Sequence, residues 1–294
     1  MCTEKCFEPT QGAAARQAGS RVSRRVALVG GAAMAATAAL GGTAQAGEGA
    51  SASTRGHGPA FPGRGRRHGL ADLTHELTTS FPAFVPGEEA RRRTVVTIED
   101  DGYYMQEWTI IEHIGTHVDA PGHFAPGGRL APELRPEELV AEAVVIDIAG
   151  RAARDPDTVV TVDDLRAFER RHGRIRRNAA VLMHSGWAAK VGDPAAYRNP
   201  DSAGTLHFPG FGPEAAEWLV RRRGVRAVGV DTLSIDPGNS TTFDAHLIVA
   251  GADRYGLENL NNLDEIPRRG TTIVVGLIPY EEGSGGQARV LASW

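Results

Sequence analysis

The segment HIGTHVDAPGHF, residues 113–124, places the tightest local limits on how this 294-residue chain can fold. It holds three of the chain's 10 histidines, together with one aspartate, two glycines and one proline. A strand would separate His113 and His117 by about 13 Å, at about 3.3 Å per residue. A helix would bring these two side chains together but turn Asp119 away, and Pro121 is excluded from the interior of a regular helix. We therefore expect an irregular loop that begins where a strand ends.

The side chains of this segment are those of a metal site. Imidazole and carboxylate groups are ligands of Zn²⁺, Mn²⁺ and Fe²⁺. Two histidines and one aspartate would leave coordination positions open for water, and a fourth basic group nearby could transfer protons. The segment therefore predicts metal-assisted hydrolysis, in which the metal lowers the pKa of water and polarises a carbonyl group. The alternative is a set of structural histidines, which the density of the cluster disfavours.

The pattern HxGTHxDxPxHF resembles the motif of the metal-dependent cyclase/hydrolase family, which includes bacterial kynurenine formamidases (arylformamidases) and isatin hydrolases. The resemblance runs from about residue 70 to 290, with similar segments at 72–75, 207–210, 229–236 and 257–260. It implies that His113, His117 and Asp119 are metal ligands and that His123 is the proton donor and acceptor. It also implies a compact α/β domain of the swivelling β/β/α type, with a mixed sheet packed against helices.

Binuclear members of this family use one more histidine and one more glutamate, and the similar positions here are His246 and Glu258. Asp119 would then bridge two ions. The residues alone favour another interpretation, a core histidine on a helix that Asp244 caps and Gly251 ends, and a surface glutamate. The resemblance implies Zn²⁺ or Mn²⁺, one or two ions per subunit, and leaves identity and number open.

Residues 81–88 (FPAFVPGE) are similar to the family's early substrate-contact segment. Formamidases commonly have a tryptophan before the Pro-Gly pair, whereas this chain has Val85 there, with Phe84 as the nearest aromatic residue. This difference argues against specificity for kynurenine derivatives. We assign Phe84 to substrate binding, with core packing as the alternative. His207 is assigned to the same site, with a turn or core histidine as the alternative.

The first 46 residues are expected to be an export signal. A twin-arginine pair, Arg24-Arg25, precedes an apolar Ala/Gly-rich run and the small-x-small sequence Ala44-Gln45-Ala46. A disordered Ala-rich tail is the alternative. The run is too poor in large apolar residues for a lasting membrane anchor. We expect a secreted or periplasmic (cell-envelope) protein with a flexible linker at residues 47–68 and a catalytic domain at 69–294.

Cysteine content and charge narrow the chemistry further. Cys2 and Cys6 both precede residue 47, so the exported chain has no disulfide and must bind metal through nitrogen and oxygen. Without the five basic and two acidic residues of the signal, 27 basic and 34 acidic residues remain, a net charge of about −7. No basic patch is interleaved with aromatic residues, so nucleic acid is not an expected partner.

Apolar runs alternate with amphipathic segments along the remaining chain. Strands are expected at residues 94–100, 103–111, 143–149, 179–184, 227–230 and 272–278. One helix is expected after Thr161, its N-cap, and another from Pro213 to the arginines before Gly224. This alternation indicates an α/β or α+β fold in one domain.

Together these features predict a metal-dependent hydrolase that cleaves a C–N amide or lactam bond and is similar to arylformamidases. The substrate would be a small-molecule amide, lactam or lactone, and the resemblance implies a homo-oligomer, a dimer or tetramer. Lactone hydrolysis or ring closure at the same site is one alternative, and a non-catalytic metal or ligand binder is another. A serine hydrolase is disfavoured because Ser185 lies outside a G-x-S-x-G sequence.

Overall fold

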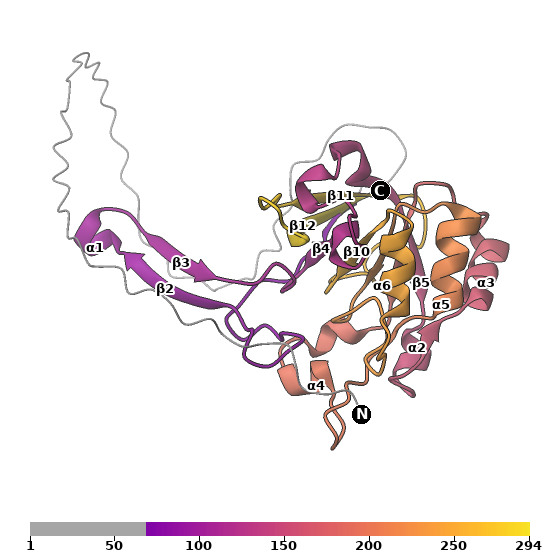
Figure 1. The fold of residues 1–294 in the computed structure, drawn as a ribbon, viewed down its shortest axis with the longest axis horizontal. Helices are drawn as coiled ribbons and strands as arrows, with labels where there is room; N and C mark the ends of the chain where they lie inside the picture. The colour runs from indigo at the N-terminus through magenta and orange to yellow at the C-terminus, as the bar shows by residue number, and fades with distance from the viewer. Residues whose placement is uncertain (1–68) are drawn as a thin grey trace, which may run out of the picture. The chain divides into compact units, whose positions relative to one another are not determined.

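Eight strands of the computed structural model form one mixed sheet that closes on itself (Figure 1). The order is β1-β12-β11-β5-β7-β9-β10-β4, and β4 also pairs with β12, so seven strands make a closed ring and β1 extends β12 outside it. The strands are β1 (Leu70–Asp72), β4 (His117–Asp119), β5 (Val140–Asp147), β7 (Ala180–His184), β9 (Ala227–Val230), β10 (Tyr255–Glu258), β11 (Thr271–Leu277) and β12 (Gly285–Ser293).

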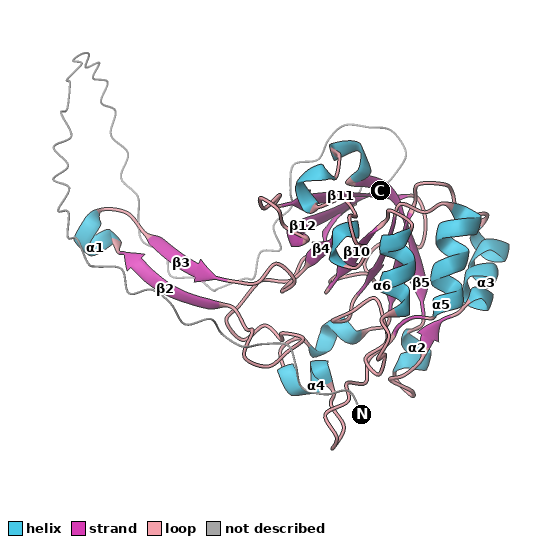
Figure 2. Cartoon of the chain, viewed as in Figure 1, coloured by secondary structure: helices cyan, strands magenta, loops and turns pink. Residues whose placement is uncertain are grey.

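Strands β5, β7, β9 and β10 are parallel, and helices make the connections between them. These helices are α3 (Val162–His172), α5 (Pro213–Trp218) continued by η5 (Leu219–Arg223), and α6 (Asp244–Gly251). Figure 2 shows them side by side on the outer face of the parallel strands. The remaining elements are α1 (Ile98–Asp101), α2 (Ala149–Ala152), α4 (Pro194–Arg198), η1 (Pro121–His123), η2 (Ala131–Glu133), η3 (Pro136–Glu138), η4 (Trp187–Lys190) and the two-stranded sheets β2 (Arg91–Val96) with β3 (Met105–Thr109) and β6 (Val159–Val160) with β8 (Gly210–Phe211).

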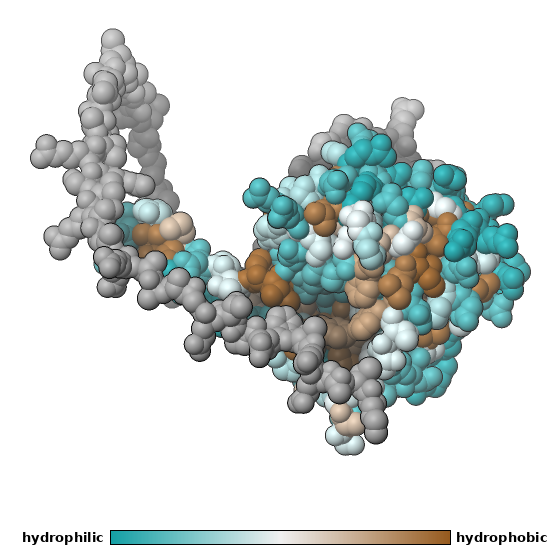
Figure 3. All heavy atoms as spheres, viewed as in Figure 1, coloured by the Kyte–Doolittle hydropathy of each residue, from teal (hydrophilic) through white to brown (hydrophobic). Residues whose placement is uncertain are grey.

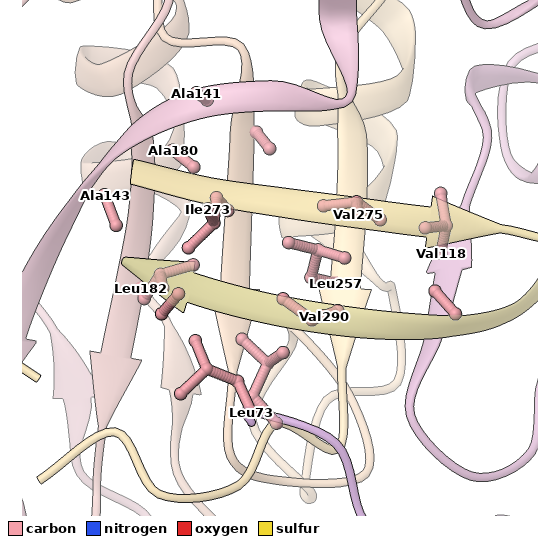
Figure 4. Packing of buried hydrophobic residues seen from close by; sticks show 14 of the residues in the cluster. Leu73, Val118, Ala141, Ala143, Ala180, Leu182, Leu257, Ile273, Val275 and Val290 are labelled. Atoms are coloured by element: carbon pink, nitrogen blue, oxygen red, sulfur yellow. The ribbon is translucent and has the colours of Figure 1, made fainter. Parts of the chain in front are cut away.

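Two hydrophobic cores follow from the alternation of side chains along the strands. In β5, Ala143 and Val145 point into the ring, where they pack with Leu182 and Val290 (Figure 4). Val144 and the other alternate residues point outwards against α3, α5 and α6. Apolar residues are needed on both faces because parallel strands are covered on both sides. The many alanines inside the ring fit the narrow interior of a small barrel.

The structure describes residues 69–294. The expected export signal (1–46) and linker (47–68) lie outside the described residues. Between residues 69 and 294, no helix is both long and apolar enough to cross a membrane.

Most expected strands of the closed sheet are confirmed. The runs at 143–149, 179–184, 227–230 and 272–278 correspond to β5, β7, β9 and β11. Thr161 is the N-cap of α3, because its hydroxyl accepts a hydrogen bond from the Asp164 amide, and Gly173 ends the helix. The α/β domain with a mixed sheet packed against helices is confirmed, whereas its assignment to the swivelling type stays a prediction.

One expected strand boundary is wrong, and one expected helix has the predicted bounds but a different type of last turn. The strand expected at 94–100 covers Arg91–Val96 instead, because Thr97 caps the short helix α1 by accepting a hydrogen bond from Asp100. The helix expected from Pro213 to the arginines is continuous, but its last five residues, Leu219–Arg223, widen into a π-helical turn before Gly224 adopts φ 61°. Both differences depend on local hydrogen bonds that residue patterns do not reveal.

Strands β2 and β3 form a ribbon that projects from the rest of the described fold (Figure 1). Tyr103, Tyr104, Met105 and Trp108 on this ribbon are exposed, and hydrophobic residues are visible near its tip in Figure 3. We call residues 91–109 the arm. A two-stranded ribbon that packs against nothing else is marginally stable in water.

Candidate metal centre and cavity

The centre of the predicted loop is a short strand. Residues 117–119 form β4, which pairs with β10 on one side and β12 on the other, so the prediction of an irregular loop is wrong there. His117 and Asp119 share one face of β4 because they are two residues apart. His117 is also the cross-strand partner of Glu258. The sheet register therefore brings in a carboxylate from 141 residues further along the chain.

His246 lies in the first turn of α6, but Asp244 does not cap this helix. The Asp236 carboxylate, from the loop after β9, accepts hydrogen bonds from the amides of Ala245 (2.8 Å) and His246 (3.0 Å). Phe243 occupies the N-cap position, and Ala252 rather than Gly251 is the C-cap. The predicted N-cap is therefore wrong, because a carboxylate from outside the helix binds its free amides, whereas the helix does end at Gly251 as expected.

Five side chains meet in two groups that share Asp119. His113, His117 and Asp119 form the first group, and Asp119, His246 and Glu258 form the second, with the candidate ligand atoms of each group within 4.8 Å of one another. Asp119 Oδ1 lies 2.6 Å from His113 Nδ1 and 3.2 Å from His117 Nε2. His246 Nε2 lies 3.5 Å from Asp119 Oδ2 and 3.2 Å from Glu258 Oε1.

Each histidine is oriented by a hydrogen bond at its other ring nitrogen. His117 Nδ1 donates to the carbonyl of Gly115 at 2.8 Å, and His246 Nδ1 donates to Asp236 at 2.6 Å. Both residues therefore present Nε2 to the centre. His113 has the opposite orientation and presents Nδ1, because its Nε2 lies 2.9 Å from the Ser284 hydroxyl. Such outer partners fix the tautomer and direction of metal-binding histidines.

The side chains fit a divalent metal ion. His117 Nε2 and Asp119 Oδ2 are buried and have no hydrogen-bond partner among residues 69–294, although such atoms normally find one. Both atoms point into the cluster. Three imidazoles and two carboxylates, all nitrogen and oxygen donors, are the ligand types of Zn²⁺ and Mn²⁺.

The buried acids and histidines of the cluster shift one another's pKa values. Burial tends to raise the pKa of Asp119, but the adjacent His117 and His113 hold it well below its usual range. Burial and the Asp119 carboxylate together raise the pKa of Glu258. Burial opposes the protonated form of His117, yet Asp119 and Glu258 raise its pKa to about 9. The carboxylates of Asp119 and Glu258 thus favour positive charge beside them.

Two glycines make room for these side chains. Gly256 and Gly285 are the partners of Asp119 on the two strands that flank β4. A Cβ atom at Gly256 would lie 2.9 Å from Asp119 Oδ2, and one at Gly285 would lie 2.5 Å from His113 Cε1. Neither glycine has a positive φ, so they are required here for space rather than for backbone conformation.

His123 belongs to neither group of candidate ligands. Its ring stacks on His113, with centroids 3.8 Å apart and planes 19° apart. Burial is the main cause that lowers the pKa of His123 to about 4, even though Asp119 favours the charged form. A neutral imidazole beside the cluster is able to accept a proton.

A cavity of about 220 Å³ opens onto the cluster, and its lining includes His113, Asp119, His123, His246 and Glu258. Its apolar wall contains Phe84, as expected for a substrate-binding residue, and also Phe124 and Phe243, which the sequence analysis missed. Phe243 has φ 52°, an unusual conformation for an aromatic residue, and such strain is concentrated at functional sites. The cavity can hold a small flat molecule against the cluster.

His207 is not among the residues that line this cavity. Its Nδ1 lies 2.8 Å from Asp157, and its Nε2 lies 3.6 Å from Asp201. Nothing in this geometry supports the assignment of His207 to substrate binding. The structure instead places it between two carboxylates in a surface turn.

Three residues that orient the histidines were not identified from the sequence: Asp236, Ser284 and Glu112. Glu112 accepts hydrogen bonds from the Ser284 amide (2.7 Å) and hydroxyl (2.8 Å), so that hydroxyl is left to accept from His113. Glu112 directly precedes His113, and this position next to the motif is the only feature of the sequence that could have indicated its role. Asp236 is the last residue of a segment similar to the family, 229–236, whereas Ser284 carries no signal, because only the folded sheet brings it to His113.

The chain is similar to known proteins in both sequence and structure. The family model described as Putative cyclase matches residues 71–237. Isatin hydrolase from Roseibium aggregatum is 32% identical over 240 residues, covering 76% of this chain and 90% of the relative. Kynurenine formamidase from Bordetella avium is 33% identical over 194 residues, covering 65% and 82%. The structure of isatin hydrolase A from Ralstonia solanacearum has a TM-score of 0.73 at 37% identity, covering 77% and 92%.

The fold and the five-residue cluster thus define a mixed α/β protein with a candidate divalent-metal centre, and its relatives are hydrolases. The chain belongs to the cyclase family, so the resemblance drawn from the motif is confirmed. The matched region ends before His246 and Glu258. Their assignment to the centre is supported by the geometry of this chain.

Proposed function

We propose that this protein is a metal-dependent hydrolase that cleaves the C–N bond of a small aryl amide or lactam. One observation carries the proposal: two groups of metal-binding side chains share Asp119 and face an aromatic cavity that also contains His123. The relatives named isatin hydrolase and kynurenine formamidase support a C–N bond as the target.

The five side chains of the cluster would hold one or two divalent ions, Zn²⁺ or Mn²⁺. A bound ion supplies a Lewis acid that lowers the pKa of water and polarises the scissile carbonyl. His123 accepts the proton that the attacking water loses and returns it to the leaving nitrogen. Phe84, Phe124 and Phe243 exclude bulk water and hold the substrate's ring in place.

The test is hydrolysis by metal-loaded protein of isatin, N-formyl-kynurenine and an aryl lactone, each with and without chelator. We expect chelator-sensitive opening of the lactam, and weaker activity towards N-formyl-kynurenine because Val85 replaces the tryptophan common in formamidases. Preferential turnover of the lactone would favour the alternative of a lactone hydrolase or cyclase. A protein that binds metal and hydrolyses none of the three would favour the non-catalytic binder.

We also propose that the protein is a homo-oligomer in which the arm packs against a second copy. The exposed Trp108, Tyr103 and Tyr104 support this, since nothing in the described chain covers them. Ile111, just beyond the arm, lines the cavity, so such packing would lie close to the substrate. The swivelling β/β/α fold type and export by a twin-arginine signal remain proposals that rest on the sequence.

A further inference from the structure

A second cavity, of about 670 Å³, is lined largely by arginine side chains. They come from the loop after α3, the end of η5, and the residues that precede β10 and β11. The segments that precede β7, β9 and β10 lie at the amino ends of parallel strands, and the one that precedes β11 leads into a strand antiparallel to β5. Glu258 ends β10 at the metal centre, whereas Arg254 directly precedes the same strand. The two sites therefore lie at opposite ends of the parallel sheet.

Four of these arginines are paired with carboxylates. Arg223 binds Glu169 through two hydrogen bonds of 2.6 and 2.7 Å. Arg221 lies 2.9 Å from Glu217. Arg176 and Arg269 share Glu142, each at 3.3 Å. These four guanidinium groups pair with only three carboxylates, so even the paired arginines leave one positive charge in excess.

Four more arginines line the cavity without any ion pair to the described residues: Arg174, Arg177, Arg222 and Arg254. The Nε atom of Arg254 is buried and has no hydrogen-bond partner in the part of the chain that the structure describes. Guanidinium groups that line one cavity repel one another, and salt screens this repulsion over about 8 Å at physiological ionic strength. The whole chain has a net charge of −4, so this excess of positive charge is local.

Helix termini explain only part of the cluster. Cations are favoured near the carboxyl ends of α3 and η5, and Arg269 donates to the carbonyl of His172 at the end of α3. Arg177 and Arg254 lie in connections outside both helices, and Arg177 instead packs over Gly224. Both residues line the same cavity, and Arg254 Nη1 donates to the neighbouring Asp253 carbonyl at 3.2 Å, whereas its Nε has no partner among the described residues.

We propose that this cavity binds a small multivalent oxyanion that carries a phosphate group. Arginine suits this role because its planar fork of N–H donors matches the oxygens of phosphate in bidentate hydrogen bonds. The ligand would neutralise the four unpaired guanidinium groups and give Arg254 Nε an acceptor. This site is independent of the metal centre and of the reaction proposed there.

The test is calorimetric titration of the metal-loaded full chain with inorganic phosphate and with pyrophosphate, at constant ionic strength maintained with NaCl. The cavity variant Arg177→Ala/Arg222→Ala is compared with Arg91→Ala/Arg154→Ala, which removes the same charge from exposed positions outside the cavity. We expect at least a tenfold loss of affinity in the cavity variant and none in the control.

Phosphate could also bind at the metal centre, so the titration is repeated with His117→Ala. The arginine site should persist in that variant, whereas binding at the metal should disappear. Equal affinities in the cavity variant and the surface control would overturn the proposal. So would the absence of any binding beyond that seen with NaCl alone.

Discussion

At the scale of single residues, the orientation of His113 depends on a hydrogen-bonded relay. Glu112 accepts from the Ser284 hydroxyl, and that hydroxyl accepts from His113 Nε2, which leaves Nδ1 facing Asp119. Removing such an outer partner typically lowers metal affinity about 10- to 100-fold. We predict a loss in this range for Ser284→Ala, measured by competition with a chromogenic chelator. The exposed Ser202→Ala is the control, and equal affinities in the two variants would show that the relay is unimportant.

The glycines beside Asp119 give a second prediction at this scale. Gly285→Ala would place its Cβ against the Val118 carbonyl oxygen and 2.5 Å from His113 Cε1. Such overpacking costs about 1–3 kcal/mol, so the melting temperature and the metal affinity should both fall. Gly150→Ala, in α2 with open space around its Cβ, should leave stability unchanged or slightly higher. A Gly285→Ala protein as stable as wild type would contradict the packing argument.

The sequence predicts the ligand types at this scale but not their partners. His113, His117 and Asp119 are recognisable because they lie within seven residues of one another. The nitrogen that each histidine presents depends on Gly115, Asp236 and Ser284. Asp236 and Ser284 lie in loops, where the periodicity of side chains does not predict which residues are in contact.

At the scale of elements, the turn that contains His207 should show a pH-dependent stability. The hydrogen bond to Asp157 is the main cause that raises the pKa of His207 above the ordinary value of 6.5. Because the folded pKa is the higher one, the stabilisation is fully present below pH 6.5 and is lost as pH rises through the folded pKa. We predict that His207→Gln removes this decline in melting temperature. Asp157→Asn should have the same effect, and an unchanged pH profile in both variants would refute the pairing.

The arm gives a prediction about assembly. If its aromatic surface packs against a second copy, Tyr104→Ser/Trp108→Ser should dissociate the oligomer, as measured by sedimentation velocity. Val274→Ser changes a residue of β11 with comparable exposure, 45% against 37% for Trp108, and should leave assembly intact. A wild-type protein that sediments as a monomer, or an arm variant that stays assembled, would argue against this role.

Elements that carry long apolar runs were predictable, whereas those that close the sheet were not. Strands β5, β7, β9 and β11 are continuous apolar segments. β4 has only three residues, and β12 begins with Gly285-Gly286, which weakens any strand signal. Each of these two strands pairs with neighbours on both sides, and these pairings are contacts that the sequence pattern does not show.

At the scale of the whole molecule, ring closure assembles the candidate centre. The pairing of β4 with both β10 and β12 brings together three distant parts of the chain: residues 113–123, 246–258 and 284–285. No local pattern predicts this convergence, and for His246 and Glu258 the residues alone favoured a core histidine and a surface glutamate. The resemblance to the family led us to expect both residues at the metal centre, and the sheet register explains physically how Glu258 reaches it.

The most direct test of this account is the amount of Zn²⁺ or Mn²⁺ that remains bound per chain after dialysis, measured by mass spectrometry of the elements. Asp119 belongs to both groups of ligands, so Asp119→Asn, which preserves size and shape, should lose all tightly bound metal. His246→Ala should spare an ion held by His113 and His117. An Asp119→Asn protein that keeps the wild-type metal content would contradict the shared centre on which the proposed hydrolysis depends.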